Sequence, residues 1–148
     1  MPDAPKPPNR VHVTWAGEQR FDAGRPNGRT VRIDGSGETG PGMVDALLSA
    51  LASCTGVDIV EILAKRRTPV ERFSVDVTGR RFEGVPRRLV HILLEYHVDG
   101  AGIDRVHAER AVELSVTKYC SVRDSLDRGI PIEYVVVVNG ERGDVKNG

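Results

Sequence analysis

The sequence predicts an α+β protein in which strands and helices are largely segregated along the chain. Segments with alternating polar and apolar residues occupy the N-terminal third, and one long apolar segment without proline follows them. Further alternating segments flank a helical stretch in the second half. Alternation with period two indicates strands with one buried face, and segregated strands and helices are typical of α+β architecture.

Length and composition limit the possible classes. The chain has 148 residues, which fits a single domain, predicted at 11–139 between a flexible N-terminal tail (1–10) and a polar C-terminal tail (140–148). Hydrophobic residues make up 39% and charged residues 28%, the profile of a globular protein. Because 21 basic residues balance 21 acidic ones, we expect no nucleic-acid partner.

The sequence also argues against secretion and membrane insertion. Its proline-rich start lacks the apolar core of a signal peptide. Uninterrupted apolar runs such as 135–138 are far shorter than the roughly 20 residues that a membrane span needs. We therefore expect a cytoplasmic protein with no membrane partner, in which both cysteines are normally reduced.

The N-terminal half is predicted to contain an antiparallel meander and a long helix. The strands are expected at 11–15, 19–23 and 30–33, and a glycine-rich loop at 35–42 follows them. The helix is expected from 43 to about 67, and its first half is apolar on almost every side. Such a helix is buried, either at the centre of the fold or within an oligomer.

The C-terminal half is predicted to begin with a hairpin of two strands, at 73–78 and 88–98. Two helices, from 104 to about 118 and from 121 to 128, precede a last strand at 131–138. The expected order of elements is therefore βββ-α-ββ-αα-β, with antiparallel sheets.

Cys54 and Cys120 are the candidate reactive side chains. Cys54 lies in the long helix among small residues, which leave room beside its sulfur. Cys120 lies at a break between two helices, and capping the second would favour its thiolate. The alternative for each is a buried packing role. Since both lie on helices, packing could bring their Cα atoms within the ~4.4–6.8 Å that a disulfide requires.

The sequence around both cysteines resembles the two signature regions of the OsmC/Ohr family, the osmotically inducible protein C and organic hydroperoxide resistance proteins. The first region is GPGMVDALL at 40–48 leading into ASCT at 52–55, and the second is KYCSV at 118–122. The second region and VDIV at 57–60 are most similar to the YhfA-like branch. The resemblance extends from about residue 11 to residue 138.

The resemblance implies an intertwined homodimer whose antiparallel sheets wrap around a long central helix. It also implies reduction of small organic hydroperoxides in oxidative stress defence. Cys54 would be oxidised to a sulfenic acid, and Cys120 would resolve it as a disulfide. No bound cofactor is expected, and an external dithiol, such as a lipoylated protein, would reduce the disulfide.

The family activates its first cysteine with an arginine from the N-terminal loop and a glutamate at the start of the cysteine helix. Arg25 stands where that arginine is expected, and Arg29 is the alternative candidate for the same role. The position of the glutamate holds Val44, which cannot ionise, and Asp45 would lie half a turn away from Cys54. This departure favours a second hypothesis, a weakly active or non-catalytic dimeric protein that binds a ligand or senses redox state.

Two other patterns carry less weight. The glycine-rich loop at 35–42 lacks the Gly-Lys-Ser/Thr of a phosphate-binding loop. His91, Glu95 and His97 share one strand face and could line a metal site, but a solvated sheet face is the more common outcome. We expect no bound metal.

Overall fold

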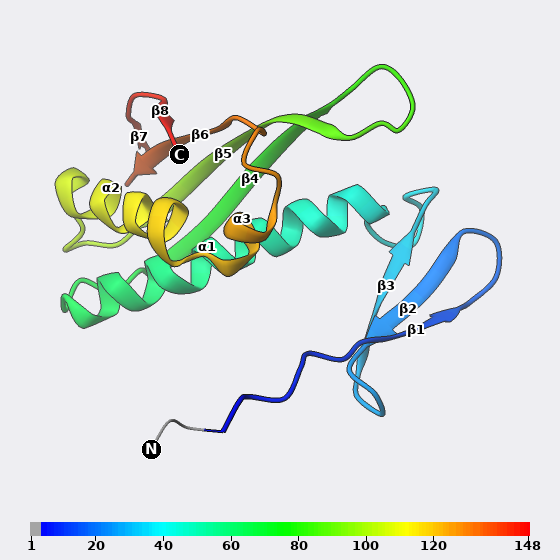
Figure 1. Cartoon of the computed structure of the whole chain (residues 1–148). Helices are drawn as coiled ribbons and strands as arrows, with labels where there is room; N and C mark the ends of the chain where they lie inside the picture. The colour runs from blue at the N-terminus through cyan, green and yellow to red at the C-terminus, as the bar shows by residue number, and fades with distance from the viewer. Residues whose placement is uncertain (1–3) are drawn as a thin grey trace. The chain divides into compact units, whose positions relative to one another are not determined.

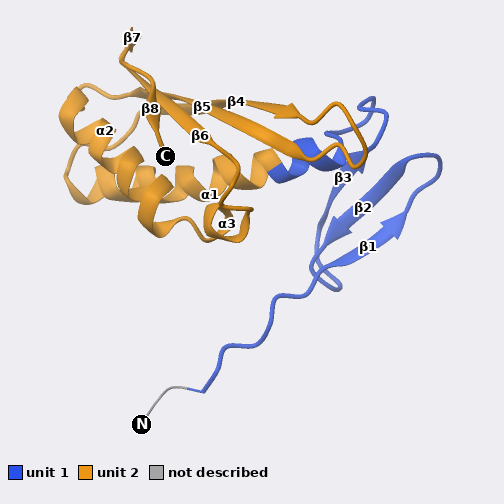
Figure 2. Ribbon diagram, turned by 45° about the horizontal axis from the view of Figure 1, so that its top comes forward, with its two compact units in different colours: residues 1–47 blue, residues 48–148 orange. Residues whose placement is uncertain are grey.

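The computed structural model of the chain describes residues 4–148 and divides into two compact units, which meet in sequence between Leu47 and Leu48 (Figure 2). The long helix α1 (Met43–Lys65) begins in the first unit and continues into the second. The order of the main elements follows the prediction, so the α+β class is confirmed (Figure 1).

The first unit contains the predicted meander. The strands β1 (His12–Trp15), β2 (Arg20–Gly24) and β3 (Thr30–Asp34) form one antiparallel sheet in that order. The expectation that β1 buries one face is wrong, because the whole strand is exposed. Within this unit the three short strands make a single layer, so Val13 and Trp15 have no second layer to pack against.

Hydrogen bonds to two carboxylates, the buried Asp34 and the exposed Asp45, order the glycine-rich loop and the start of α1. Thr39 and Ser36 each donate both a hydroxyl and a backbone N–H to Asp34, and these bonds hold the pKa of Asp34 far below its ordinary value. The Asp45 carboxylate accepts the backbone N–H of Gly42 at 2.9 Å and so satisfies a donor at the helix entry.

The second unit is built on a sheet whose main strands are β4 (Arg72–Arg81), β5 (Leu89–Asp99) and β6 (Ile132–Val138). β4 and β5 form the predicted antiparallel hairpin. However, β5 and β6 are parallel, which corrects the expectation of purely antiparallel sheets. The reason lies in the connection between them, because parallel neighbours need a crossover and the helical segment between β5 and β6 provides it.

The segment expected to be a polar C-terminal tail contains two short strands. β7 (Glu141–Arg142) and β8 (Lys146–Asn147) both pair antiparallel with β6. The chain reverses direction at Asn139 and Gly140, both of which have positive φ angles. This pairing continues the sheet beyond β6.

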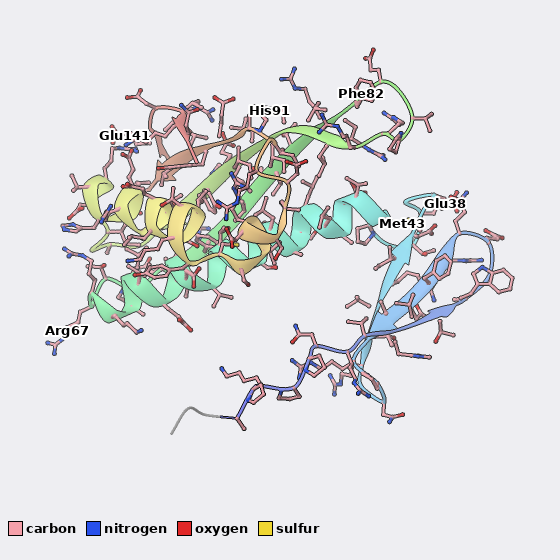
Figure 3. The ribbon with its side chains drawn as sticks, viewed as in Figure 1. Glu38, Met43, Arg67, Phe82, His91 and Glu141 are labelled. Carbon is pink, nitrogen blue, oxygen red and sulfur yellow. The ribbon has the colours of Figure 1, made fainter. Side chains whose placement is uncertain are left out.

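Helices cover one face of this sheet (Figures 1 and 2). They are α1, α2 (Arg105–Leu114) and the short α3 (Ser121–Ser125). The β5 side chains that point toward them are fully buried, and they are Ile92, Leu94, Tyr96 and Val98. The alternate β5 residues form a polar outer face that includes His91 (Figure 3), which contacts Glu133 of β6. The alternation read from the sequence therefore predicts the two faces of β5 correctly from His91 onward, whereas Leu89 at the start of the strand is buried.

α1 has one buried face and one exposed apolar face. Leu51, Ile59 and Leu63 are completely buried in the core. On other sides of the helix, four large apolar residues are 37–57% exposed, namely Met43, Leu47, Val57 and Val60. By length and composition α1 is also apolar enough to cross a membrane, a property that core helices of soluble proteins share. The single chain therefore covers only part of the helix.

Candidate active site

Cys54 lies in the middle of α1, next to the buried face of the helix. Its immediate neighbour Thr55 is completely buried, whereas Cys54 itself is half-buried. The Cys54 Sγ lies 3.9 Å from the hydroxyl of Ser121, at the start of α3. The helix therefore presents this sulfur to the segment that carries the second cysteine.

A buried hydrogen-bond network fixes this turn of α1. The Tyr96 hydroxyl on β5 donates to Thr55 Oγ1 at 2.7 Å. The Ser115 hydroxyl, at the end of α2, contacts the Thr55 carbonyl oxygen at 3.0 Å and the Asp58 carboxylate at 2.9 Å. Because these groups are largely withdrawn from water, their hydrogen bonds specify the geometry strongly. α1 is thus tied both to the sheet and to the chain that leads to Cys120.

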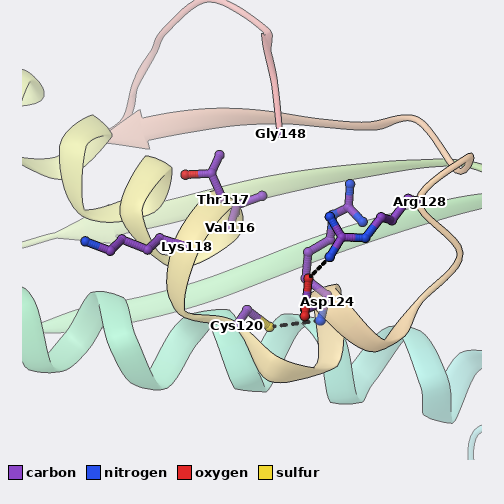
Figure 4. A pocket seen from close by; sticks show the side chains of 8 residues that line it. Val116, Thr117, Lys118, Cys120, Asp124, Arg128 and Gly148 are labelled. Carbon is purple, nitrogen blue, oxygen red and sulfur yellow. Dashed lines mark hydrogen bonds and ion pairs between the residues drawn. The ribbon is translucent and has the colours of Figure 1, made fainter.

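A π-helical turn positions Cys120. The predicted helix from 104 to about 118 is regular only in α2, and Ser115–Tyr119 form a π-helical turn in which the backbone N–H of Cys120 donates to the Ser115 carbonyl. Cys120 then caps α3, one of the two roles considered for it, and its Sγ accepts the backbone N–H of Arg123 at 3.3 Å (Figure 4). α3 ends at Ser125, three residues earlier than expected. π-helical turns change the direction of the following residue and are frequent at functional sites.

The two thiols lie close enough to influence each other's ionisation, and their surroundings set their pKa values apart. Burial acts to raise the pKa of Cys54, but donors outweigh it, namely the Val122 N–H, the Cys120 thiol and both the hydroxyl and the N–H of Ser121. The pKa of Cys54 is therefore lowered. Cys120 is only 3% exposed, and burial raises its pKa to about 11, with the Cys54 sulfur as a further cause. The sequence-based expectation that capping favours a thiolate at Cys120 is wrong, because burial outweighs the cap.

The donors at the start of α3 were not identified from the sequence. The first N–H groups of a helix lack partners within the helix, so those of Ser121 and Val122 are available to an anion. The predicted helix start directly after Cys120 was the signal for such donors. Only the structure shows that they serve Cys54, which lies far away in sequence.

The opposite pKa shifts of the two thiols predict that Cys54 is alkylated selectively. A thiolate is the reactive form, and a lowered pKa makes it available at lower pH. We expect the rate at which iodoacetamide labels Cys54 to reach half its maximum at a pH below 9.0, the ordinary pKa of a thiol. The labelling rate of Cys120 should reach half its maximum only near pH 11. Peptide mass spectrometry across a pH series measures both midpoints. Ser121→Ala should raise the Cys54 midpoint, Ser125→Ala should not, and earlier labelling of Cys120 would contradict the assignment.

The other predicted site residues lie in or near the first unit. Arg25 lies in the turn between β2 and β3, where it lines a cavity of about 590 Å³ together with residues 7–11 and Pro26. Arg29, the alternative candidate for the activating arginine, lies in the same turn and is exposed. Val44 occupies the first turn of α1, and the neighbouring Asp45 bonds to the entry of its own helix. A role of Arg25 at the thiol stays a prediction.

One cluster of side chains could hold a cation. His97 Nε2 lies 3.0 Å from a Glu95 carboxylate oxygen and 3.2 Å from one of Asp76, on the polar face of β4 and β5. Glu95 also pairs with the guanidinium of Arg142. These side chains are already paired with one another, as is usual on a solvated sheet face. The expectation of no bound metal stays a prediction.

The fold and the paired thiols define an OsmC-like protein. A family model described as "OsmC-like protein" matches residues 35–135, and the chain belongs to this family. Protein YhfA of Escherichia coli K12 is 33% identical over 126 residues, which cover 84% of this chain and 94% of YhfA. The resemblance to the OsmC/Ohr family and its YhfA-like branch is thereby confirmed.

Solved structures share this fold. A hypothetical protein from Aquifex aeolicus is 26% identical, with a TM-score of 0.79 over 90% of this chain and 97% of its own. The organic hydroperoxide resistance protein OhrB of Bacillus subtilis is 14% identical, with a TM-score of 0.57 over 88% of this chain and 97% of its own. At that identity the similarity to OhrB concerns the fold alone.

Proposed function

We propose that this protein reduces organic hydroperoxides through a cycle of sulfenic acid and disulfide at Cys54 and Cys120. One observation carries the proposal: the Cys54 sulfur lies 3.9 Å from the hydroxyl of Ser121, the residue next to Cys120, and the pKa values of the two thiols are shifted in opposite directions. A lowered pKa provides a nucleophilic thiolate at Cys54. A raised pKa keeps Cys120 protonated until the first step has occurred.

The cycle follows from this arrangement. The Cys54 thiolate attacks the terminal oxygen of the hydroperoxide, the O–O bond breaks, and the alkoxide leaves as an alcohol after taking a proton. The sulfur of Cys120 then attacks the Cys54 sulfenic acid and loses its proton, and water leaves as the disulfide forms. A neighbouring thiol protects a sulfenic acid from irreversible oxidation, which explains the value of this proximity.

An external dithiol completes the proposed cycle. Two electrons are needed to restore both thiols, and thiol–disulfide exchange supplies them without a bound cofactor. A lipoylated protein is one reductant of this kind. Membership of the OsmC-like family supports the assignment, since solved relatives include proteins named for organic hydroperoxide resistance. A cytosolic location fits the need for reduced thiols.

We also propose that the protein acts as a homodimer. In the single chain Val57 is 57% exposed and Met43 is 50% exposed, although both lie on the most apolar helix of the protein. Exposed apolar surface of this kind usually marks an interface. A second copy of the chain would cover this face of α1, as the family resemblance also implies.

Counting thiols tests the peroxidase directly. Reduced protein is treated with one equivalent of cumene hydroperoxide, and in parallel with hydrogen peroxide. We expect rapid loss of both thiols to an intramolecular disulfide, faster with the organic peroxide. Persistence of both thiols would overturn the proposal.

The main alternative is a dimeric protein that binds a ligand or senses redox state with little turnover. Val44 favours it, because a valine stands where the resemblance predicts an activating glutamate. The alternative predicts negligible peroxide consumption together with saturable binding of a small ligand. The same thiol count therefore separates the two functions.

A further inference from the structure

The loop that joins β4 to β5 carries a positive charge that the proposed function does not use. Its segment RRFEGVPRR, at 80–88, contains four arginines and one glutamate, so its net charge is +3 in a chain whose overall charge is zero. The loop projects from the end of the sheet and carries Phe82 (Figures 1 and 3). Every residue of the segment except Gly84 is exposed. The charge is therefore presented on the surface of the second unit.

The four arginines of this loop have no acidic partner within the part of the chain that the structure describes. The arginine ion pairs of residues 4–148 belong to other arginines, namely Arg20, Arg32, Arg72, Arg105, Arg110, Arg128 and Arg142. Glu83, the acidic residue of the loop, forms no ion pair with its arginine neighbours in these residues. Each guanidinium offers five N–H donors, so most of them are available to the carboxylates of a partner.

Contacts within the loop fix its shape. The Nε–H of Arg81 donates to the carbonyl oxygen of Arg87 at 2.8 Å, across the loop. The backbone N–H of Phe82 donates to the carbonyl oxygen of Arg88, also at 2.8 Å. The ring of Phe82 packs against Gly84, where an added Cβ would overlap the ring. A loop that is already held in one conformation loses less conformational freedom when it binds a partner.

Two apolar side chains lie between the two pairs of arginines. Val85 is 96% exposed and Phe82 is 51% exposed. Aromatic and arginine side chains are enriched among the residues that dominate binding energy at protein interfaces. A guanidinium can also hold a carboxylate through two parallel hydrogen bonds. The loop therefore fits a polypeptide that offers both carboxylates and an apolar side chain.

A protein partner fits this loop better than a polyanionic surface does. Nucleic acids and anionic membranes attract a protein through an excess of positive charge spread over its surface. In this chain 21 basic residues balance 21 acidic ones, so such an excess is absent. Contacts between a few arginines and a few carboxylates need only the local charge.

We propose that the β4–β5 loop is a docking site for an acidic segment of a partner protein. Carboxylates of that segment pair with the arginines on both arms of the loop, Arg80 and Arg87 among them. Phe82 and Val85 pack against an apolar side chain of the same segment. Docking of this kind requires neither cysteine, so it stands or falls separately from the peroxidase.

Peptide selection tests the chemistry of the partner. A phage-displayed library of random peptides is first depleted on the full-length variant Arg80→Gln/Arg87→Gln and then selected on the unmodified chain. In residues 4–148 neither of these two side chains forms a hydrogen bond or an ion pair, so the variant should fold normally. We expect the enriched peptides to be acidic and to contain a large apolar residue. Enrichment of neutral or basic peptides, or no enrichment after depletion, would overturn the proposal.

Affinities of a selected peptide locate the contacts. Fluorescence anisotropy measures its dissociation constant, which should rise as salt is added. We expect Arg80→Gln/Arg87→Gln to raise this constant at least about tenfold, because two charge-assisted contacts are lost. Lys65→Gln/Arg66→Gln removes two charges from the exposed end of α1 and should change the constant less than about twofold. An equal loss in both variants would contradict a site on the loop.

A second pair of variants tests the apolar contact. Val85→Ser removes apolar surface from the loop and should raise the dissociation constant at least about threefold. Val106→Ser changes another exposed valine, on α2, and should leave the constant unchanged. Equal constants for Val85→Ser and the unmodified chain would refute the apolar half of the proposed site.

Three further measurements separate the other possible occupants of the loop. Vesicles of phosphatidylcholine and phosphatidylserine, and a short DNA duplex, are each mixed with the unmodified chain and with Arg80→Gln/Arg87→Gln at physiological ionic strength. Sedimentation velocity compares the oligomeric state of the same two proteins. We expect no binding to vesicles or duplex and no difference in oligomeric state. Binding that the variant loses, or a homodimer that the variant dissociates, would assign the loop to that occupant and overturn the proposal.

Discussion

Cys54→Ser is expected to abolish hydroperoxide consumption, with a loss of at least about 10³-fold in rate. A serine hydroxyl has no ionised form near neutral pH, whereas the hydrogen bonds around Cys54 stabilise a thiolate. Consumption of cumene hydroperoxide, coupled to dithiol oxidation, measures the loss. Ser53→Ala is the control, since the Ser53 hydroxyl bonds back to its own helix, and this variant should retain the rate within about twofold.

Cys120→Ser should behave differently from Cys54→Ser. The first step remains possible, so one equivalent of peroxide is still consumed, but no thiol is present to form the disulfide. We expect a mass increase at Cys54 that advances from one oxygen to two as peroxide is added. Equal inactivity of both variants without this over-oxidation would contradict the separate roles of the two cysteines.

Val57→Asp is expected to dissociate the proposed homodimer. The side chain is 57% exposed in the single chain, so the folded protomer can accept a carboxylate there. In a covered apolar interface the same carboxylate would lose its water without gaining a partner. We expect the dissociation constant measured by sedimentation velocity to rise at least 100-fold, which corresponds to about 2.8 kcal/mol.

A second valine provides the control for this substitution. Val106 lies on α2, is 73% exposed, and is not part of the apolar face of α1. Val106→Asp should leave the oligomeric state unchanged, and circular dichroism should show both variants folded. A native protein that sediments as a 16.2 kDa monomer at micromolar concentration would refute the dimer.

Most of the fold could be predicted from local patterns. The alternation along 88–98 identifies both faces of β5, because one face packs on helices and the other contacts solvent. Alternation does not encode the direction of a neighbouring strand, so the parallel pairing of β5 with β6 could not be predicted in this way. The π-helical turn at Ser115–Tyr119 was likewise invisible, since its residues fit the period of an ordinary helix.

The candidate site was predicted only in part. Both cysteines were identified from their sequence surroundings, and the cap formed by Cys120 followed from the break between two helices. The direction of their pKa shifts could not follow from the sequence, because it depends on burial and on donors that tertiary packing supplies. The hydrogen bonds of Ser115 to Thr55 and Asp58 were missed for the same reason.

The crossover between β5 and β6 makes the thiol pair a reporter of the packing of that crossover on α1. Cys120 lies within that crossover, so it reaches Cys54 only when the helical segment of the crossover has packed on α1. Once closed, a disulfide across so long a loop would add about 4 kcal/mol to stability. The disulfide form would then be the form of the protein most resistant to unfolding.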